Sequence, residues 1–378
     1  MKRFNDYRIR LMFVGFVGAV VLGGRSASVK ADFTFGTPTK VPNVNSSSAE
    51  VYPEISADGL TLYFVSNEPH SASVAYCDIW LATRVAIGDE WDTPVKLGPT
   101  VNSSAAEADP SISTDGLALY FSDGISGAPG GFTHRPGGYG QSDLWVTMRA
   151  ATDDPWGTPV NLGPIVNSSS REGNQCISAD NLSLYFYSDR SGGYGLIDLW
   201  VTTRETTDAD WGSPINLGPP VNSSASESGP SLSADGLSLF FTANYRSDTY
   251  GSSDLYMTTR TSTSDPWGPV INLGPNVNSS SGEGDPSIST DGSTLYFHRG
   301  QPGVPSSYDL WQVSIKPVVD FNGDGIVDAA DMCIIVDNWH TDNTLCDIAP
   351  LPLGDGFVDV QDLIVLAEHL FEEFPPVE

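Results

Sequence analysis

The sequence predicts an all-β, five-bladed β-propeller with four-stranded antiparallel blades over residues 32–316, followed by a small α-helical domain over residues 317–378. Two observations predict this division. A phrase typified by "PSISTDGLALYF" (from residue 110) occurs five times, and its central aspartate falls at 58, 115, 180, 235 and 291. Such regular recurrence is typical of an array of similar structural units. Helical periodicity is essentially absent between Asp32 and Ile315 and begins only after residue 320.

The N-terminus carries the parts of a secretory signal peptide, predicted over residues 1–31. Basic residues precede the apolar run "LMFVGFVGAVVLGG" (11–24), and Val29 and Ala31 offer small residues before a cleavage site at Asp32. The run has 14 residues, fewer than the ~20 that a transmembrane helix needs. We therefore expect a secreted protein, extracellular or associated with a cell surface, without membrane insertion after cleavage.

The chain is strongly acidic, with 18 Lys and Arg against 47 Asp and Glu and a formal charge of −29. No basic patch offsets this charge, so nucleic acids and anionic membranes are poor candidate partners. Cations and neutral ligands remain open. We expect the protein to be a monomer.

Each repeat contains four short strand signals. The first strand ends in an Asp-Gly turn, or Asp-Asn in the third copy, whose residues suit the positive φ of a tight hairpin. An alternating segment such as "LALYF" predicts the second strand, and a segment such as "DLWVTMR" predicts the third. The fourth, such as "WGTPVNLG", has proline before its pairing residues, which is typical of an edge strand. Four strands repeated five times predict a propeller.

The two ends of the repeated region predict how the ring closes. The mature chain opens on "FGTPTKVPNVNSSSAE" (35–50), which matches the end of a repeat such as "WGTPVNLGPIVNSSSRE" (156–172). The fifth copy stops after "YDLWQVSI" and lacks this tail. The N-terminal strand is therefore expected to complete the last blade, which removes the exposed edge of an open array.

The pattern "SxDG…LYFxSDR…DLW" resembles the TolB-like, WD40-like propeller repeat of exported bacterial proteins over residues 35–315. The resemblance implies the propeller fold. It leaves function open, because propellers carry out both binding and catalysis.

A glutamate ends each repeated "VNSSSxE" segment, on the face that the family geometry assigns to the ligand-binding loops. The five are Glu50, Glu107, Glu172, Glu227 and Glu283. They could bind a cation, supply an acid and base pair, or accept hydrogen bonds from backbone N–H groups in their own turns. Their equal sequence context argues against a division into acid and base, and the hydrogen-bonded alternative is favoured.

The loops between the second and third strands differ between copies, and they supply a second set of candidate ligand-binding residues. Differences between copies are where a symmetric scaffold can acquire a specific site. Aromatic, cationic and imidazole side chains on these loops suit a sugar or peptide ligand. The candidates are His134, Arg135, Arg190, Tyr194, Arg246 and Arg299.

Asp109 and Asp285 are the first candidates if the propeller is an enzyme. They share a repeat position that is occupied elsewhere by Tyr52, Asn174 and Gly229. A glycoside hydrolase or lyase requires channel carboxylates that differ from their copies. No GxSxG, HExxH, Walker A, GxGxxG or CxxC motif is present, and no catalytic residue is assigned.

The stretch "DFNGDGIVDAAD" (320–331) has the spacing of a calcium loop. Oxygen ligands at positions 1, 3, 5, 7, 9 and 12 and glycine at position 6 are what Ca²⁺ requires. These ligands are Asp320, Asn322, Asp324, the carbonyl of Ile326, Asp328 and Asp331. A second copy (351–371) keeps Asp355, Asp359 and Asp362 but has leucine at two ligand positions, so a second ion remains open.

These two tandem loop–helix units, over residues 319–373, resemble a type I dockerin, the module by which secreted proteins attach to a cohesin on a scaffold or cell surface. In that family the loop ends and first helical turns face the cohesin. The resemblance implies an interface at Ala329, Ala330, Val336 and Asp337 in the first unit, or at Val360, Gln361, Ala367 and Glu368 in the second.

Four cysteines are present, and their spacing predicts one disulfide. Cys333 and Cys346 lie 13 residues apart in the helical domain, where a bridge is favoured over two thiols. Cys77 and Cys176 belong to different repeats and are expected to be structural thiols.

The dockerin resemblance implies a carbohydrate ligand, because proteins with this module are commonly directed at plant or algal polysaccharide. We therefore expect a secreted recognition propeller, attached through a calcium-dependent dockerin to a cohesin and more inclined to binding than to catalysis. A glycoside hydrolase or lyase with its active site in the propeller channel is the first alternative. A protein-binding structural propeller is the second.

Overall fold

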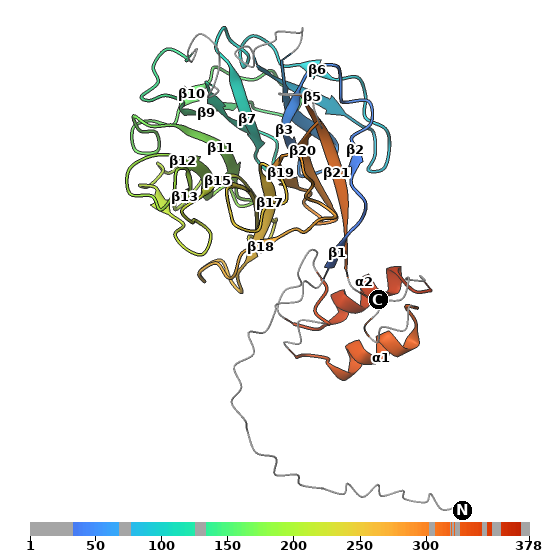
Figure 1. Cartoon of the computed structure of the whole chain (residues 1–378). Helices are drawn as coiled ribbons and strands as arrows, with labels where there is room; N and C mark the ends of the chain where they lie inside the picture. The colour runs from blue at the N-terminus through green and yellow to red at the C-terminus, as the bar shows by residue number, and fades with distance from the viewer. Residues whose placement is uncertain are drawn as a thin grey trace, which may run out of the picture. The chain divides into compact units, whose positions relative to one another are not determined.

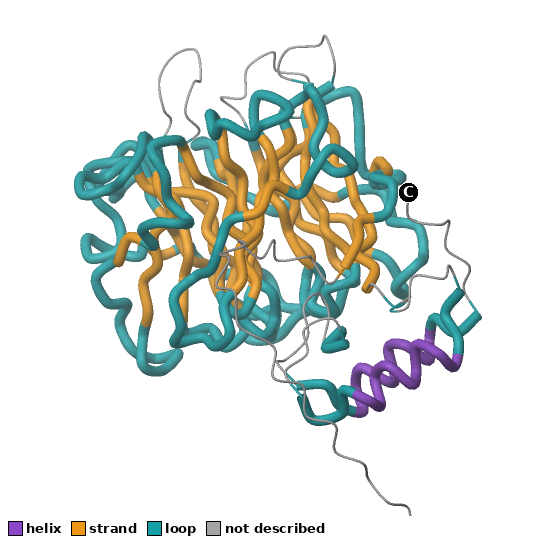
Figure 2. Tube along the Cα trace, turned by 60° about the horizontal axis from the view of Figure 1, so that its bottom comes forward, coloured by secondary structure: helices purple, strands orange, loops and turns teal. Residues whose placement is uncertain are grey.

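The computed structural model describes residues 33–67, 77–124, 134–301, 307–317, 319, 321, 326–341, 346–349 and 357–371. The signal peptide expected at residues 1–31 lies outside the described residues. Five antiparallel sheets form the blades of a propeller, and short helices follow in the C-terminal segment (Figures 1 and 2). The prediction of five antiparallel blades is confirmed.

Each of blades 1 to 4 runs in sequence order from the first to the fourth strand of its sheet. Blade 1 contains β3 (Glu50–Ile55), β4 (Thr61–Ser66), β5 (Asp78–Thr83) and β6 (Val95–Lys96), and blade 2 contains β7 (Glu107–Ile112), β8 (Ala118–Asp123), β9 (Leu144–Met148) and β10 (Val160–Asn161). Blade 3 contains β11 (Glu172–Ile177), β12 (Ser183–Ser188), β13 (Asp198–Thr203) and β14 (Ile215–Asn216). Blade 4 contains β15 (Ser226–Leu232), β16 (Ser238–Asn244), β17 (Asp254–Thr259) and β18 (Ile271–Asn272). The fourth strands are only two residues long, as the proline before them limits pairing.

Blade 5 contains β19 (Glu283–Ile288), β20 (Thr294–Gly300) and β21 (Tyr308–Pro317), and residues 33–40 complete it. Both β1 (Phe33–Phe35) and β2 (Thr39–Lys40) pair antiparallel with β21. The Asn276 side chain of blade 4 donates hydrogen bonds to the carbonyls of Phe35 (2.7 Å) and Gly36 (2.9 Å). The predicted closure of the ring by the N-terminal strand is confirmed.

The first strands of the blades surround the central axis, each packed against the first strands of its two neighbours. Side chains on these strands bind the next blade. Ser111 Oγ accepts from Ile177 N (3.2 Å), Ser231 Oγ from Ile288 N (3.0 Å) and Ser287 Oγ from Ile55 N (3.1 Å). The last of these bonds joins blade 5 to blade 1, so the inner ring is closed as well as the outer sheet.

The hairpin between the first two strands is built alike in every copy. Asp58 Oδ1 accepts from Ser56 Oγ (2.6 Å) and Leu60 N (2.9 Å), and Gly59 follows with φ of 70°. In the third copy Asn181 takes the glycine position with φ of 60°. The predicted Asp-Gly turns are confirmed, and asparagine replaces glycine because it tolerates the left-handed region.

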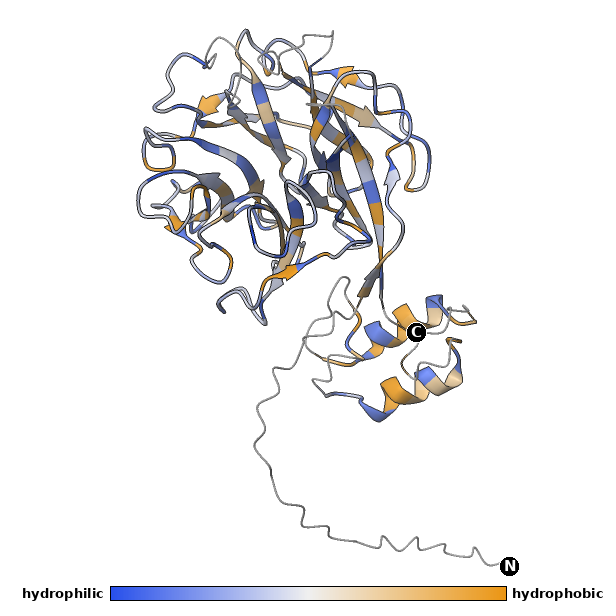
Figure 3. Ribbon diagram, in the orientation of Figure 1, coloured by the Kyte–Doolittle hydropathy of each residue, from blue (hydrophilic) through white to orange (hydrophobic). Residues whose placement is uncertain are grey.

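Apolar and polar residues alternate along the propeller strands (Figure 3), and the apolar faces pack between blades. Between blades 1 and 2, for example, Val65 and Ile79 contact a cluster that includes Leu119, Phe121 and Trp145. Cys77 and Cys176 are buried in the propeller and form no disulfide among the described residues, as predicted.

The C-terminal segment contains α1 (Ala329–Asp337) and α2 (Val360–Glu368), which share one apolar core. Both helices begin with a capping box, at Asp328 with Asp331 and at Asp359 with Asp362. Neither helix, among the described residues, is long and apolar enough to cross a membrane.

The two loop–helix units are related by a duplicated backbone contact. His340 N donates to Val358 O (2.8 Å), and Phe371 N donates to Val327 O (2.8 Å). The end of each unit therefore pairs with the residue that precedes the helix cap of the other.

The disulfide predicted between Cys333 and Cys346 is wrong. Cys333 is exposed on α1, whereas Cys346 is fully buried and its thiol contacts the carbonyl of Ile334 at 4.0 Å. The short sequence separation suggested a bridge, but the helix directs one side chain outward while the other packs into the shared core.

Candidate functional site

The inner strand of each blade is irregular at one equivalent position, close to the axis. Its pairing with the second strand shifts there in every blade. The residues at this position all have left-handed φ angles, between 44° and 55°: Tyr52, Asp109, Asn174, Gly229 and Asp285. Bulges re-aim side chains, and left-handed non-glycine residues concentrate at functional sites. These five residues line one small axial cavity of about 30 Å³.

A second position that differs in every blade lies beside the first. On the second strands, the residue after the shared phenylalanine is Val65, Ser122, Tyr187, Thr242 or His298. Ser122 Oγ donates to Asp109 Oδ2 (2.6 Å), and Thr242 Oγ1 accepts from Asp285 N (2.8 Å). The repeats are alike over most of their strands, yet these two dissimilar positions converge at the axis. Sequence comparison of the repeats identified the first position and missed the second, although its variation was visible there.

Asp109, Asn174 and Asp285, which we call the axial cluster, form a continuous hydrogen-bonded array. Asn174 Nδ2 donates to Asp109 Oδ1 (3.1 Å) and to Asp285 Oδ1 (2.9 Å), and Asn174 N donates to Asp109 Oδ2 (2.9 Å). Because one nitrogen reaches both carboxylates, the two acceptor oxygens lie within about 6 Å of each other. The cluster thus brings together carboxylates from blades 2 and 5.

Burial raises the pKa of two carboxyl groups that line the axial cavity. Burial raises the pKa of Asp109 to about 7, against hydrogen bonds that lower it, and the nearby Asp285 charge adds to the rise. Burial likewise raises the pKa of Glu54 to about 7, although Ile112 N (3.2 Å), Ser287 Oγ (3.0 Å) and Ser111 Oγ (3.2 Å) donate to it. Both groups therefore change charge near neutral pH.

A larger cavity of about 170 Å³, which we call the side cavity, adjoins Tyr52 at the boundary of blades 1 and 5. It is lined by Ala49, Val51, Tyr52, Asn67, Cys77, His298 and Tyr308. The His298 ring makes edge contacts with Tyr52 and Tyr308, with centroids 6.0 and 5.1 Å apart. His298 Nδ1 lies 3.2 Å from Asp285 Oδ2, an electrostatic contact rather than a well-directed hydrogen bond. The histidine links the side cavity to the axial cluster.

The five predicted glutamates are held within their own blades. Glu172 illustrates the arrangement: its carboxylate accepts from Ser168 N (2.9 Å), Ser168 Oγ (2.6 Å) and Arg190 Nη2 (2.9 Å). The serine contacts recur at Glu50, Glu107, Glu227 and Glu283. None of the five is among the residues that line the axial or side cavity. This geometry agrees with the alternative in which each glutamate accepts hydrogen bonds within its own turn.

The predicted loop arginines bind these glutamates instead of projecting from the loops. Arg135, Arg190, Arg246 and Arg299 pair with Glu107, Glu172, Glu227 and Glu283, whose side chains are 0% exposed. Each arginine also donates to a valine carbonyl of the preceding segment. Of the other two loop candidates, Tyr194 is exposed and His134 lies against Gly124. The structure does not bring this set to the axial cluster.

The predicted calcium ligands are only partly described. Asp320, Asn322, Asp324 and Asp355 lie outside the described residues. Asp331 and Asp362 are fully buried and accept backbone hydrogen bonds, from Phe321 (2.8 Å) and Asp328 (2.9 Å) and from Ile348 (2.6 Å), Ala349 (2.9 Å) and Asp359 (2.7 Å) respectively. Ile326 and Asp328 precede α1, and Asp359 precedes α2. Within the described ranges no three acidic, His or Cys side chains form a metal-binding group.

The residues predicted to face a cohesin are all exposed on the helices. They are Ala329, Ala330, Val336 and Asp337 on α1, and Val360, Gln361, Ala367 and Glu368 on α2. Their equivalent placement follows from the duplication of the unit.

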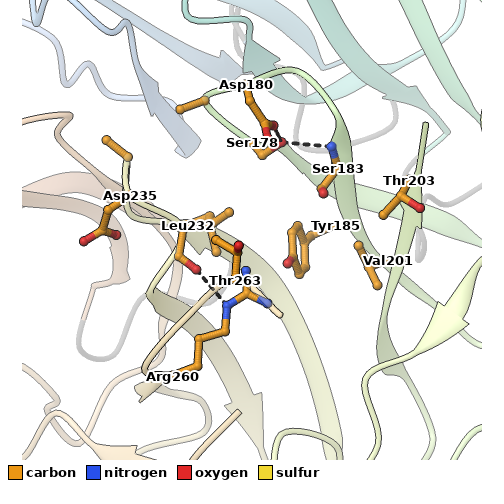
Figure 4. Close-up of a pocket in the computed structure, with 13 residues that line it drawn as sticks. Ser178, Asp180, Ser183, Tyr185, Val201, Thr203, Leu232, Asp235, Arg260 and Thr263 are labelled. Carbon is orange, nitrogen blue, oxygen red and sulfur yellow. Dashed lines mark hydrogen bonds between the residues drawn. The ribbon is translucent and has the colours of Figure 1, made fainter. Parts of the chain in front are cut away.

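Another cavity, of about 410 Å³, is a groove between blades 3 and 4 at the hairpin-turn face. Tyr185 and Arg260 both line it (Figure 4), where the Arg260 charge acts on the Tyr185 phenol and Arg260 Nε donates to the Gly236 carbonyl (2.9 Å). The same tyrosine–arginine pairing recurs as Tyr63 with Arg149, Tyr120 with Arg204, and Tyr296 with Arg84. A contact repeated at four blade boundaries belongs to the scaffold.

No family model matches the sequence, and no curated protein matches it. Solved structures do resemble it. A protein described as TolB from Agrobacterium tumefaciens is 16% identical over 76% of this chain and 86% of its own, with a TM-score of 0.42. The α-L-arabinofuranosidase PaAbf62A from Podospora anserina is 12% identical over 76% and 98%, with a TM-score of 0.48. A structure described as an RGII complex of BT0996 is 9% identical over 77% and 93%, with a TM-score of 0.50. At these identities the similarity concerns the fold alone.

Proposed function

We propose that the propeller binds a carbohydrate at the axial cluster and the adjoining side cavity. The observation that carries the proposal is the convergence of dissimilar residues at the axis of an otherwise repeated scaffold. Two carboxylates and an amide offer acceptors and donors for sugar hydroxyls. Tyr52, His298 and Tyr308 supply aromatic surface beside them. Few directed polar groups next to apolar walls are typical of a small-molecule site.

Hydrolysis of a glycosidic bond is a second candidate, favoured by the pair of carboxylates. The acceptor oxygens of Asp109 and Asp285 lie within about 6 Å of each other, a separation closer to the ~5–5.5 Å of retaining glycosidases than to the ~6.5–9.5 Å of inverting ones. The pKa of Asp109 is raised to about 7, so this carboxyl could donate a proton near neutral pH. Asp285 would then be the second carboxyl group of the pair.

The C-terminal segment is proposed to be a calcium-dependent dockerin that attaches the secreted protein to a cohesin. Three features support this: the duplicated loop–helix unit, the two capping boxes, and the exposed positions on both helices. The oxygen-rich spacing of residues 320–331 fits Ca²⁺. Bound calcium would organise loops that a core this small does little to fix.

One experiment tests the two propeller functions together. The mature chain is incubated with soluble polysaccharides in calcium buffer, and protein depletion and reducing-end release are both followed. Retention without product supports binding, whereas product that disappears in an Asp109→Asn, Asp285→Asn variant supports hydrolysis. If no polysaccharide depletes the protein and none releases reducing ends, both binding and hydrolysis are excluded. The matched control is Glu205→Gln, which removes one exposed charge from a residue that lines neither cavity.

A further inference from the structure

The charges around the axial cluster are one-sided. Three carboxyl groups, Glu54, Asp109 and Asp285, line the axial cavity. Among the described residues that line the axial and side cavities there is no lysine or arginine. The nearby arginines are paired elsewhere: Arg299 pairs with Glu283, and Arg171 with Asp189. Above about pH 7, where Asp109 and Glu54 are ionised, a ligand entering this site therefore meets negative charge that no lysine or arginine of the two cavities offsets.

The phenol groups at the site respond to the same negative potential. Burial raises the pKa of Tyr52 well above its ordinary value, and the charges of Asp109 and Asp285 raise it further. Burial also raises the pKa of Tyr187, with Asp109 the next cause. Both phenols consequently stay neutral over the physiological range, and of the two Tyr52 lines both cavities and could donate its hydroxyl proton to a ligand. Hydroxyl donors and carboxylate acceptors together complement a ligand whose polar groups are themselves hydroxyls.

The size of the side cavity limits what can occupy it. Its volume is about 170 Å³, below the ~300–1,000 Å³ of a pocket for a drug-sized ligand. Such a volume suits one ring rather than several. Tyr52 and Tyr308 each make an edge contact with the His298 ring, and the three rings give the cavity aromatic walls. Through His298, a ring in this cavity would be next to Asp285.

We propose that the site selects a single neutral sugar ring and rejects acidic sugars such as uronic acids and sulfated or phosphorylated units. This inference rests on the proposed carbohydrate binding and specifies the substrate class. A carboxylate or sulfate on the ligand would lie close to Asp109 or Asp285 in a site of reduced dielectric, where like charges repel strongly. Salt would weaken this repulsion only slightly, because the charges are shielded from solvent.

The test is to measure binding of the mature full-length protein to an array of neutral, uronic acid and sulfated oligosaccharides of equal length. Methyl-esterified and free-acid oligogalacturonates on the array form a pair with the same sugar backbone, in which the ester replaces each carboxylate charge with a neutral methyl ester. We expect every binder to be neutral, and acidic counterparts to bind at least about tenfold more weakly. In Asp109→Asn and Asp285→Asn variants this difference should shrink, whereas in Glu205→Gln it should persist.

The possible outcomes separate this inference from the function on which it rests. Acidic oligosaccharides that bind as tightly as neutral ones would overturn the selection rule and leave carbohydrate binding intact. A charge preference that is unchanged in both aspartate variants, with the variants folded by circular dichroism, would also overturn it. If no oligosaccharide binds, the proposed function itself fails, and the selection rule fails with it.

Discussion

Asn174 of blade 3 donates a 2.9 Å hydrogen bond to Asp285 of blade 5, although 111 residues separate them along the sequence. The same amide binds Asp109 of blade 2. One side chain therefore joins three blades across the axis. Repeats that are otherwise alike have diverged at the position where their side chains meet, and this divergence locates the site.

Replacing Asn174 should disrupt the site while leaving the blade intact. Asn174→Gly keeps the left-handed φ of 44° but removes the amide that binds both carboxylates. We expect carbohydrate binding at least about tenfold weaker and a loss of about 1–2 kcal/mol in the free energy of unfolding. The control is Asn181→Gly, because Asn181 has φ of 60° at a turn where the other copies have glycine. Equal effects of the two variants in calorimetry and denaturation would contradict the role given to the amide.

The stability of the propeller should fall as pH rises toward neutrality. Glu54 and Asp109 have folded-state pKa values raised to about 7 by burial, from ordinary values of 4.5 and 3.8. Between these limits the folded state binds more protons than the unfolded state, so the free energy of unfolding decreases with increasing pH. Each group contributes roughly 3–4 kcal/mol across its window, and the loss is complete above about pH 7.

Urea denaturation of the mature protein from pH 4 to 8 measures this slope. Glu54→Gln and Asp109→Asn should each flatten it, whereas Glu205→Gln should not. A wild-type stability that rises steadily from pH 5 to 7 would show that neither carboxyl is protonated in the folded protein.

The buried arginine–glutamate pairs should matter far more than the partly exposed ones. Arg190→Met leaves the Glu172 carboxylate, 0% exposed, without its cation and without one of the three side chains that donate to its Oε1 atom. Breaking such a pair costs about 3–5 kcal/mol. Arg171→Met breaks the pair with Asp189 in the same blade, where the side chains are 26% and 21% exposed, and should cost about 1 kcal/mol or less. Denaturant unfolding of both variants compares them; a smaller loss for Arg190→Met would argue that Glu172 is protonated or otherwise solvated.

Closure by the first residues of the mature protein should be essential to the ring. Deleting residues 33–40 removes β1 and β2, the buried Phe33 and both partners of Asn276. The side of β21 left without a partner would be open to pairing with other molecules. We expect a loss of at least about 3 kcal/mol in stability and concentration-dependent association in analytical ultracentrifugation. Asn276→Ala, which removes only two hydrogen bonds, should lose less and stay monomeric.

Much of the propeller could be predicted because its determinants are local and repeated. Asp58 and Gly59 fix their hairpin by contacts within a few residues, and five copies of that signal leave little ambiguity. The closing strand was predictable because the unmatched tail of a repeat stands at residues 35–50, before the first copy of the repeat. Cys333 shows the opposite case. The direction of its side chain depends on how α1 is rotated about its own axis relative to the core, and the spacing of the two cysteines does not determine that rotation.

The candidate site was only half predictable. Asp109 and Asp285 could be found by aligning the repeats, since they depart from their copies. His298 and Ser122 belong to strands whose residues pack by alternation, so nothing local indicates that they reach the axis. The repeated glutamates and loop arginines suggested ligand binding, yet pairing them requires the distance between two loops of one blade. That distance is a property of the fold and not of either segment.

Calcium should stabilise the C-terminal segment through the first loop. Asp331 ends that loop and also caps α1, where its carboxylate accepts from Phe321 and Asp328. Asp331→Ala should abolish calcium binding measured by isothermal titration and remove the calcium-dependent rise in the melting temperature of the C-terminal segment. Asp337→Ala, an exposed change on the same helix, should leave both intact. Because losing the cap alone destabilises α1 by about 1 kcal/mol, the decisive quantity is the difference with and without EDTA. If the melting temperature of the protein is the same in calcium and in EDTA, the basis for a calcium-dependent dockerin is removed. A residual calcium response in Asp331→Ala would indicate that the second loop, ending at Asp362, also binds the ion.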